Sequence, residues 1–72
     1  MSAVSGLLPR CGETVLVSPS AGAHITSTYW MRVADIRPSN QPGWIYLYGE
    51  PVESPAKAHT LFVRIEGLVI RR

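Results

Sequence analysis

Apolar residues recur along this chain in short alternating runs that are separated by turn-forming residues. Within Thr60–Glu66, the residues Leu61, Val63 and Ile65 fall on one face of an extended segment, and polar and aromatic residues fall on the other. No stretch has the i, i+3, i+4 recurrence of a sustained amphipathic helix. Six prolines and six glycines divide the chain into segments of strand length. The pattern predicts an all-β domain.

Five strands are predicted, with loop or turn composition between them. They are expected over Glu13–Val17, Thr28–Arg37, Trp44–Glu50, Thr60–Glu66 and Leu68–Arg71. The alternation of the second strand slips by one residue near Ala34-Asp35, which predicts a β-bulge there. Residues 1–12 are expected to form an N-terminal arm, and residues 13–72 a single small β-barrel domain.

The layout of residues 13–72 resembles the Src-homology-like small β-barrels and their Tudor, KOW and Sm-like relatives. The resemblance lies in the number and spacing of the strands and in the closing element Val63–Ile70, which contains a tight step at Glu66-Gly67. No residue motif is specific for one family of this group. The resemblance implies a five-stranded, partly open barrel. The main alternative is the OB-fold, but Pro51–Ala58 is too short and too rich in proline for the helix of that fold.

The strand Trp44–Glu50 is apolar on both faces, so its periodicity alone does not decide which face is buried. Trp44, Tyr46 and Tyr48 share one face, opposite Ile45 and Leu47. A small barrel packs aliphatic side chains in its interior, whereas buried tyrosine and tryptophan need partners for their polar groups. The aromatic row is therefore expected outside. The expected core is aliphatic: Val15, Val17, Val33, Ile45, Leu47, Leu61, Val63, Ile65, Leu68 and Ile70.

Arginines are expected to flank the aromatic row. Phe62 and Arg64 join its face if the third and fourth strands pair in antiparallel register, and Arg32 approaches from the second strand. Aromatic rings stack on nucleic-acid bases, but tryptophan, tyrosine and arginine also dominate protein–protein hot spots. A third interpretation is structural, with one or two aromatics covering the open end of the barrel. The candidate binding residues are Trp44, Tyr46, Tyr48, Phe62, Arg32, Arg64, Arg71 and Arg72.

Composition narrows the classes of partner. Seven Lys and Arg against five Asp and Glu give a net charge of +2, and six of the seven basic residues are arginine, which favours planar and bidentate contacts. The hydrophobic content of 46% is high for 72 residues with so little interior, and it agrees with self-association.

The sequence holds no recognisable catalytic or metal-binding constellation. Cys11, His24 and His59 lack paired metal-ligand spacing, and no nucleophile–base pair or phosphate-binding glycine pattern is present. We expect no enzyme activity, no cofactor, no metal and no small-molecule substrate. The single thiol fits a reducing compartment. No signal peptide or membrane-spanning run is recognisable, so a cytoplasmic location without membrane contact is expected.

Two functions remain open. The leading hypothesis is a non-enzymatic, nucleic-acid-associated regulator or accessory protein of a bacterial or viral mobile element, with DNA or RNA as the partner. The alternative is a structural or adaptor protein that acts through protein–protein contacts, as a homo-oligomer or as a component of a larger assembly such as a virion. Arginines gathered on one face would favour nucleic acid, and scattered arginines would favour the alternative.

Overall fold

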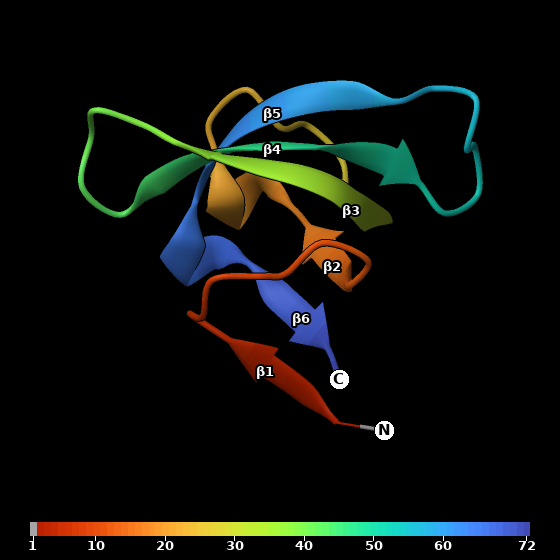
Figure 1. The fold of residues 1–72 in the computed structure, drawn as a ribbon, viewed down its shortest axis with the longest axis horizontal. Coiled ribbons are helices and arrows are strands. Elements are labelled where there is room, and N and C mark those ends of the chain that lie inside the picture. The colour runs from red at the N-terminus through yellow and green to blue at the C-terminus, as the bar shows by residue number, and fades with distance from the viewer. Residues whose placement is uncertain (1) are drawn as a thin grey trace.

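Six antiparallel strands form one sheet in residues 2–72, the part of the chain that the computed structural model describes. The strands are β1 Ala3–Ser5, β2 Thr14–Val17, β3 Tyr29–Pro38, β4 Trp44–Pro51, β5 His59–Arg64 and β6 Val69–Arg71, with the 3-10 turns η1 Pro19–Ala21 and η2 Ile65–Gly67. Their order is β1-β6-β2-β3-β4-β5 (Figure 1). The two end strands, β1 and β5, do not pair with each other, so the sheet curls over its core without closing into a barrel.

The all-β class is confirmed, but the structure has six strands where five were expected. The additional strand, β1, lies within the predicted N-terminal arm and pairs with β6, with Val4 opposite Ile70. Backbone hydrogen bonds of 2.8 Å join Ser2 and Arg72 in both directions just beyond this pairing. Three residues carry too little alternation to predict a strand, and β1 takes its hydrogen bonds from the far end of the chain. Near the C-terminus, the fourth predicted strand ends at Arg64 instead of Glu66, because the turn η2 begins at Ile65.

The predicted bulge is confirmed in β3. Its register against β4 shifts between Val33, which lies opposite Gly49, and Asp35, which lies opposite Tyr48. The extra residue, Ala34, is exposed. The bulge lets β3 keep Val33 in the core while Asp35 reaches the outer face beside Tyr48.

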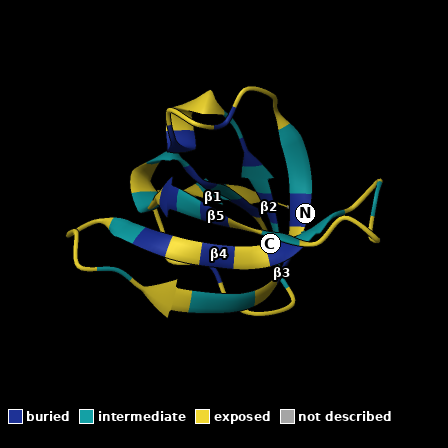
Figure 2. Cartoon of the chain, turned by 90° about the horizontal axis from the view of Figure 1, so that it is seen from above, coloured by how far each residue is buried: buried dark blue, intermediate teal, exposed yellow. Residues whose placement is uncertain are grey.

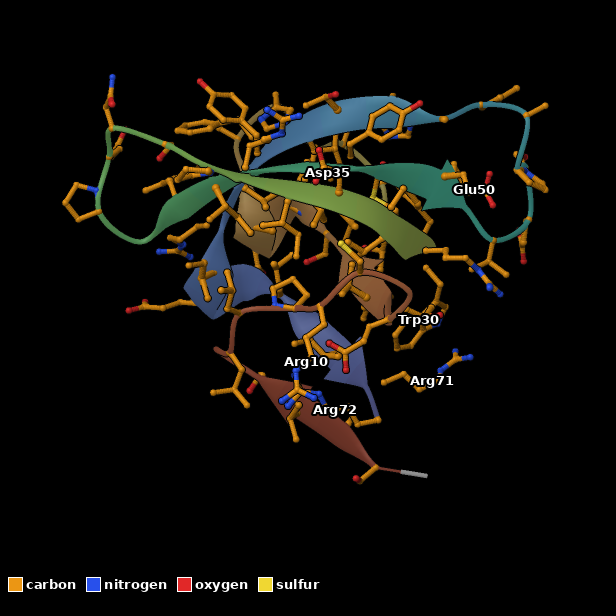
Figure 3. The ribbon with its side chains drawn as sticks, viewed as in Figure 1. Arg10, Trp30, Asp35, Glu50, Arg71 and Arg72 are labelled. Carbon is orange, nitrogen blue, oxygen red and sulfur yellow. The ribbon has the colours of Figure 1, made fainter. Side chains whose placement is uncertain are left out.

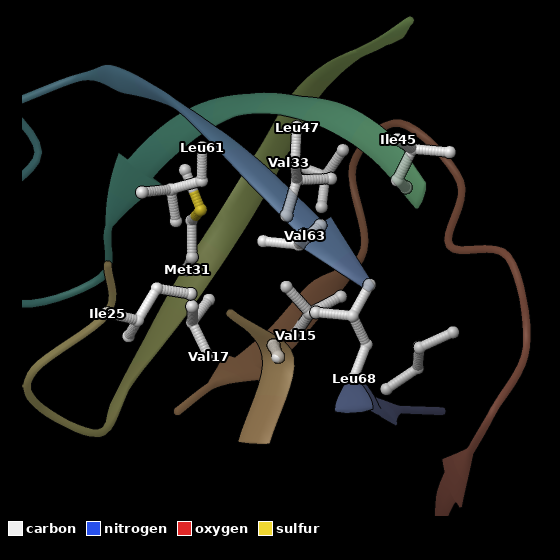
Figure 4. Close-up of a cluster of buried hydrophobic side chains, with 12 residues drawn as sticks. Val15, Val17, Ile25, Met31, Val33, Ile45, Leu47, Leu61, Val63 and Leu68 are labelled. Atoms are coloured by element: carbon white, nitrogen blue, oxygen red, sulfur yellow. The ribbon is translucent and has the colours of Figure 1, made fainter. Parts of the chain in front are cut away.

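Aliphatic side chains fill the inner face of the curled sheet (Figure 4). Nine of the ten residues predicted for the core are buried, and the tenth, Ile65, is half-buried against it. Ala21, Ile25 and Met31 complete the cluster. No tyrosine or tryptophan of residues 2–72 is buried in it, and no buried side-chain polar atom of this range lacks a hydrogen-bond partner. Figure 2 shows the result along β4, where buried and exposed residues alternate.

An ion pair ties the C-terminus to the start of β2. The Arg72 guanidinium donates to both carboxylate oxygens of Glu13, from Nε at 2.7 Å and from Nη2 at 3.3 Å. The backbone N–H of Arg10 donates to the same carboxylate at 2.7 Å, and Arg10 and Arg72 lie close together in Figure 3. The hydrogen bond from Arg72 holds the pKa of Glu13 below its ordinary value, with the Arg10 N–H adding to this effect.

The lowered pKa of Glu13 makes the stability of the fold depend on pH. The pair stabilises the folded chain above the ordinary pKa of about 4.5, and the effect is lost as the pH falls through the lower pKa of the folded state. We expect Glu13→Gln to lower the melting temperature at neutral pH, by an amount that shrinks as the solution is acidified. Thermal unfolding followed by circular dichroism across the acidic range measures this, with exposed Glu66→Gln as the control. Equal melting temperatures of Glu13→Gln and wild type at neutral pH would contradict the prediction.

The two 3-10 turns pack together through Gly67. A Cβ atom on Gly67 would overlap the carbonyl oxygen of Ser20 and the Cα of Ala21. Because these are backbone atoms, the substitution Gly67→Ala must push η1 and η2 apart. We expect a loss of about 1–3 kcal/mol in the free energy of unfolding, measured by chemical denaturation. Glu66→Ala, at an exposed position of the same turn, should cost much less.

Candidate nucleic-acid interface

Four aromatic side chains gather on the outer face of β4 and β5. Trp44 and Phe62 stack with ring centroids 4.8 Å apart at 19°, and Tyr46 meets Phe62 at 5.1 Å and 42°. Tyr48 continues the row along β4 and, like Tyr46, is more than two-fifths exposed. These four residues are called the aromatic ledge below. Their predicted outward orientation is confirmed, as is the antiparallel register that brings Phe62 opposite Tyr46.

The turn before β4 fixes the position at which the ledge begins. The Ser39 hydroxyl lies 2.6 Å from the carbonyl oxygen of Trp44 and accepts from the backbone N–H of Gln41 at 3.1 Å. The Trp44 N–H donates back to the carbonyl oxygen of Gln41 at 3.1 Å. Gly43 closes the turn with φ of 80°, a left-handed conformation that glycine adopts without strain. The indole is therefore carried on a short turn held by several hydrogen bonds.

Two arginines border the ledge, and they differ in how far their charge is compensated. Arg64 lies opposite Trp44 and donates from Nη2 to the carbonyl oxygen of Ser20 at 2.9 Å. It makes no ion pair with any residue of 2–72. Arg37, opposite Tyr46, makes an ion pair with Asp35 at 2.9 Å. The hydrogen bond from Arg37 holds the pKa of Asp35 below its ordinary value, so the carboxylate is ionised and neutralises Arg37. Of the two arginines at the ledge, Arg64 is therefore the one whose charge is uncompensated.

The other three predicted arginines lie outside the cluster of Trp44, Tyr46, Phe62 and Arg64, although Arg32 lines a shallow pocket together with Tyr48 of the ledge. Arg32 and Arg71 are the cross-strand neighbours of Thr14 on its two sides, and Arg32 also lies opposite Glu50. Arg72 is held by Glu13 in the C-terminal ion pair. The eight predicted site residues therefore fall into three groups, of which only the ledge with Arg64 forms one contiguous aromatic and basic surface.

Trp30 is the site residue that the sequence interpretation missed. The Arg71 guanidinium carbon lies 4.1 Å from the centroid of its ring, a cation–π contact between the start of β3 and the end of β6, where Figure 3 labels both residues. A groove of about 730 Å³ opens beside this pair, and its wall includes Leu16, Thr28, Pro51, Val52 and Glu53. The sequence held one signal: alternation in the second strand places Trp30 on the same outward face as Arg32.

His59, the first residue of β5, is held by hydrogen bonds to two other segments of the fold. Its Nδ1 donates to the carbonyl oxygen of Lys57 at 2.8 Å, so its Nε2 accepts from the Tyr29 hydroxyl at 2.9 Å in the neutral tautomer. Burial raises the pKa of Tyr29 above its ordinary value. These bonds join the β4–β5 loop to the start of β3.

A metal-ligand cluster and a membrane-spanning helix are both absent from residues 2–72. No three histidine, cysteine, aspartate or glutamate side chains of this range come together as metal ligands. None of its helical segments has the length and apolar character needed to cross a membrane. Comparisons of the chain with protein-family models, with curated proteins and with solved structures found no match.

Proposed function

We propose that this chain is a non-enzymatic module that binds single-stranded DNA or RNA across the aromatic ledge. The observation that carries the proposal is the cluster of Trp44, Tyr46 and Phe62, with centroid distances of 4.8 and 5.1 Å, beside the uncompensated guanidinium of Arg64. Outward-facing rings next to a free cation suit a ligand made of flat bases and phosphates. The exposed thiol of Cys11 agrees with the cytoplasmic location that this function needs.

The strand order supports the Src-homology-like assignment that belongs to this proposal. Strands β2, β3, β4 and β5 follow one another as an antiparallel meander, and β6 returns after the single turn η2 to pair with β2. The outer face of β4, in the middle of this meander, carries three of the four ledge residues.

The charge balance also supports an anionic ligand. Two of the seven basic side chains are held in ion pairs, with Asp35 and with Glu13. Five basic and three acidic side chains of residues 2–72 remain outside such pairs, so the cationic excess lies on groups that a ligand can reach. Release of counterions from neutralised phosphates makes binding of this kind fall with salt, with a slope of about −0.7 per contact for single strands.

Removal of a ledge ring tests the proposal. We expect Trp44→Ala and Phe62→Ala to weaken binding by about 5- to 150-fold, because each stacked base contributes about 1–3 kcal/mol. Fluorescence anisotropy with labelled single-stranded DNA and RNA, at several salt concentrations, measures the affinity. Trp44→Phe keeps a stacking face and should retain most of it, and Leu8→Ala, at an exposed apolar residue off the ledge, should have no effect. Wild type without salt-sensitive binding to either polymer would refute the proposed function.

Self-association is a second candidate function, and two observations favour it. Leu7 and Leu8 are adjacent and about half exposed between β1 and β2, where they form an apolar patch. The arginines are also spread over the ledge, the Trp30 groove and the C-terminal ion pair, which is the arrangement expected of the structural or adaptor alternative.

Light scattering separates this candidate from the first. Self-association through the patch predicts a mass above the 7.9 kDa of one chain that rises with concentration. The double substitution Leu7→Ser/Leu8→Ser should then restore the mass of one chain, because it removes most of the exposed apolar area of the patch. A wild-type mass of 7.9 kDa at every concentration would exclude self-association while leaving nucleic-acid binding intact.

A further inference from the structure

The Trp30–Arg71 pair lies at the opposite end of β4 from the start of the aromatic ledge. The backbone N–H of Val52, just after β4, donates to the carbonyl oxygen of Trp30 at 3.0 Å. Trp44 and Val52 are separated by eight residues, at most about 26 Å at about 3.3 Å per residue. Tyr48, 43% exposed, lies between the two ends on the same outer face. The outer side of the sheet therefore carries two tryptophan–arginine clusters with an exposed aromatic ring between them.

Arg71 is arranged to bind an anion while it covers the indole. A guanidinium that stacks flat on a ring keeps its N–H donors directed outward in the plane, where they can reach an oxygen acceptor. Arg71 is exposed and makes no ion pair in residues 2–72. Arg32, on the other side of Thr14, makes none in this range either. Two uncompensated guanidinium groups thus flank one threonine on the outer face of β3, β2 and β6.

We propose that this cluster is a second contact for the same nucleic-acid strand, in which Trp30 holds Arg71 in position and Arg71 binds a phosphate, with Arg32 on the other side of Thr14. The inference rests on the proposed function and adds to it a minimum length of ligand. Glu53 lines the groove and Glu50 lies opposite Arg32, so the phosphate is expected on the side of Arg71, away from both carboxylates. A strand that reaches from Trp44 to the second cluster spans up to about 26 Å, which agrees with the lower end of single-strand site sizes, about 4 nucleotides or more.

A series of ligand lengths tests the second contact. Anisotropy titrations use labelled oligodeoxythymidylates of about 3 to about 12 nucleotides, which run from shorter than the span to well beyond it. We expect Trp30→Ala and Arg71→Ala to bind the shortest ligand like wild type and to lose at least about fivefold in affinity for the longest. Arg71→Lys keeps the charge without the planar stack and should lose affinity in the same length-dependent way.

Two control variants separate the possible causes of a weaker affinity. Arg10→Ala removes the same charge from an exposed loop residue and should lower the affinity for every length slightly. Trp44→Ala should weaken every length, because it damages the ledge itself. Circular dichroism establishes that each variant is folded, and Arg71→Lys keeps the test valid if Trp30→Ala unfolds the domain.

The results distinguish failure of the second contact from failure of the proposed function. If Trp30→Ala and Arg71→Lys bind the longest oligonucleotide like wild type while Trp44→Ala does not, the second contact is wrong and the ledge remains. If the Trp30 and Arg71 variants lose affinity by the same factor for every oligonucleotide length, the proposed binding at two separate contacts is also overturned. If wild type binds no length of single strand, the proposed function itself fails.

Discussion

The packing of aliphatic side chains on the inner face of one curled sheet is the constraint from which the other features follow. Ile45 and Leu47 of β4 are buried, so the period of two along the strand turns Tyr46 and Tyr48 outward. A chain of 72 residues has one interior and little volume in it, and the described core holds aliphatic side chains without an aromatic ring. The aromatic ledge is therefore the surface that remains when the core has been filled.

The ion pairs determine which arginines are left for a ligand. Glu13 holds Arg72 in a two-point contact that joins residues 59 apart in the sequence. Asp35, brought to the outer face by the bulge, holds Arg37 beside the ledge through a single contact. A surface pair stabilises a fold modestly, and each pair also neutralises a positive charge that a ligand would otherwise meet. Of the arginines outside these pairs, Arg64 lies at one end of the outer face, and Arg71 and Arg32 flank Thr14 toward the other.

Local patterns in the sequence predicted the structural features that neighbouring residues determine, such as strands, turns and strand faces. They did not predict contacts between segments that are distant in the sequence. Alternation and turn composition located β2 to β6 to within a few residues, identified the bulge at Asp35 and separated the two faces of β4. The strand β1 and the cation–π contact of Trp30 with Arg71 join segments far apart in the chain, and no local period marks such a pairing. The structure separates arginines that were predicted to lie on one surface, and the cause is the same. The position of Arg71, for example, follows from the pairing of β6 with β2, which no local pattern indicates.

The shape of the outer face bears on the kind of nucleic acid that would suit the proposed function. Because the sheet curls around its core (Figure 1), its outer face is convex. Trp44 begins β4 and Trp30 is bonded to Val52 just after its end, so the two tryptophans lie near opposite ends of that strand. A stiff duplex keeps its bases stacked inside and touches a convex surface over a short length, so it cannot offer flat bases to both ends. A single strand can bend over the curve, stack bases on the aromatic ledge and keep its phosphates beside Arg64 and Arg71. The curvature that the aliphatic core imposes thus favours the flexible polymer over the rigid one.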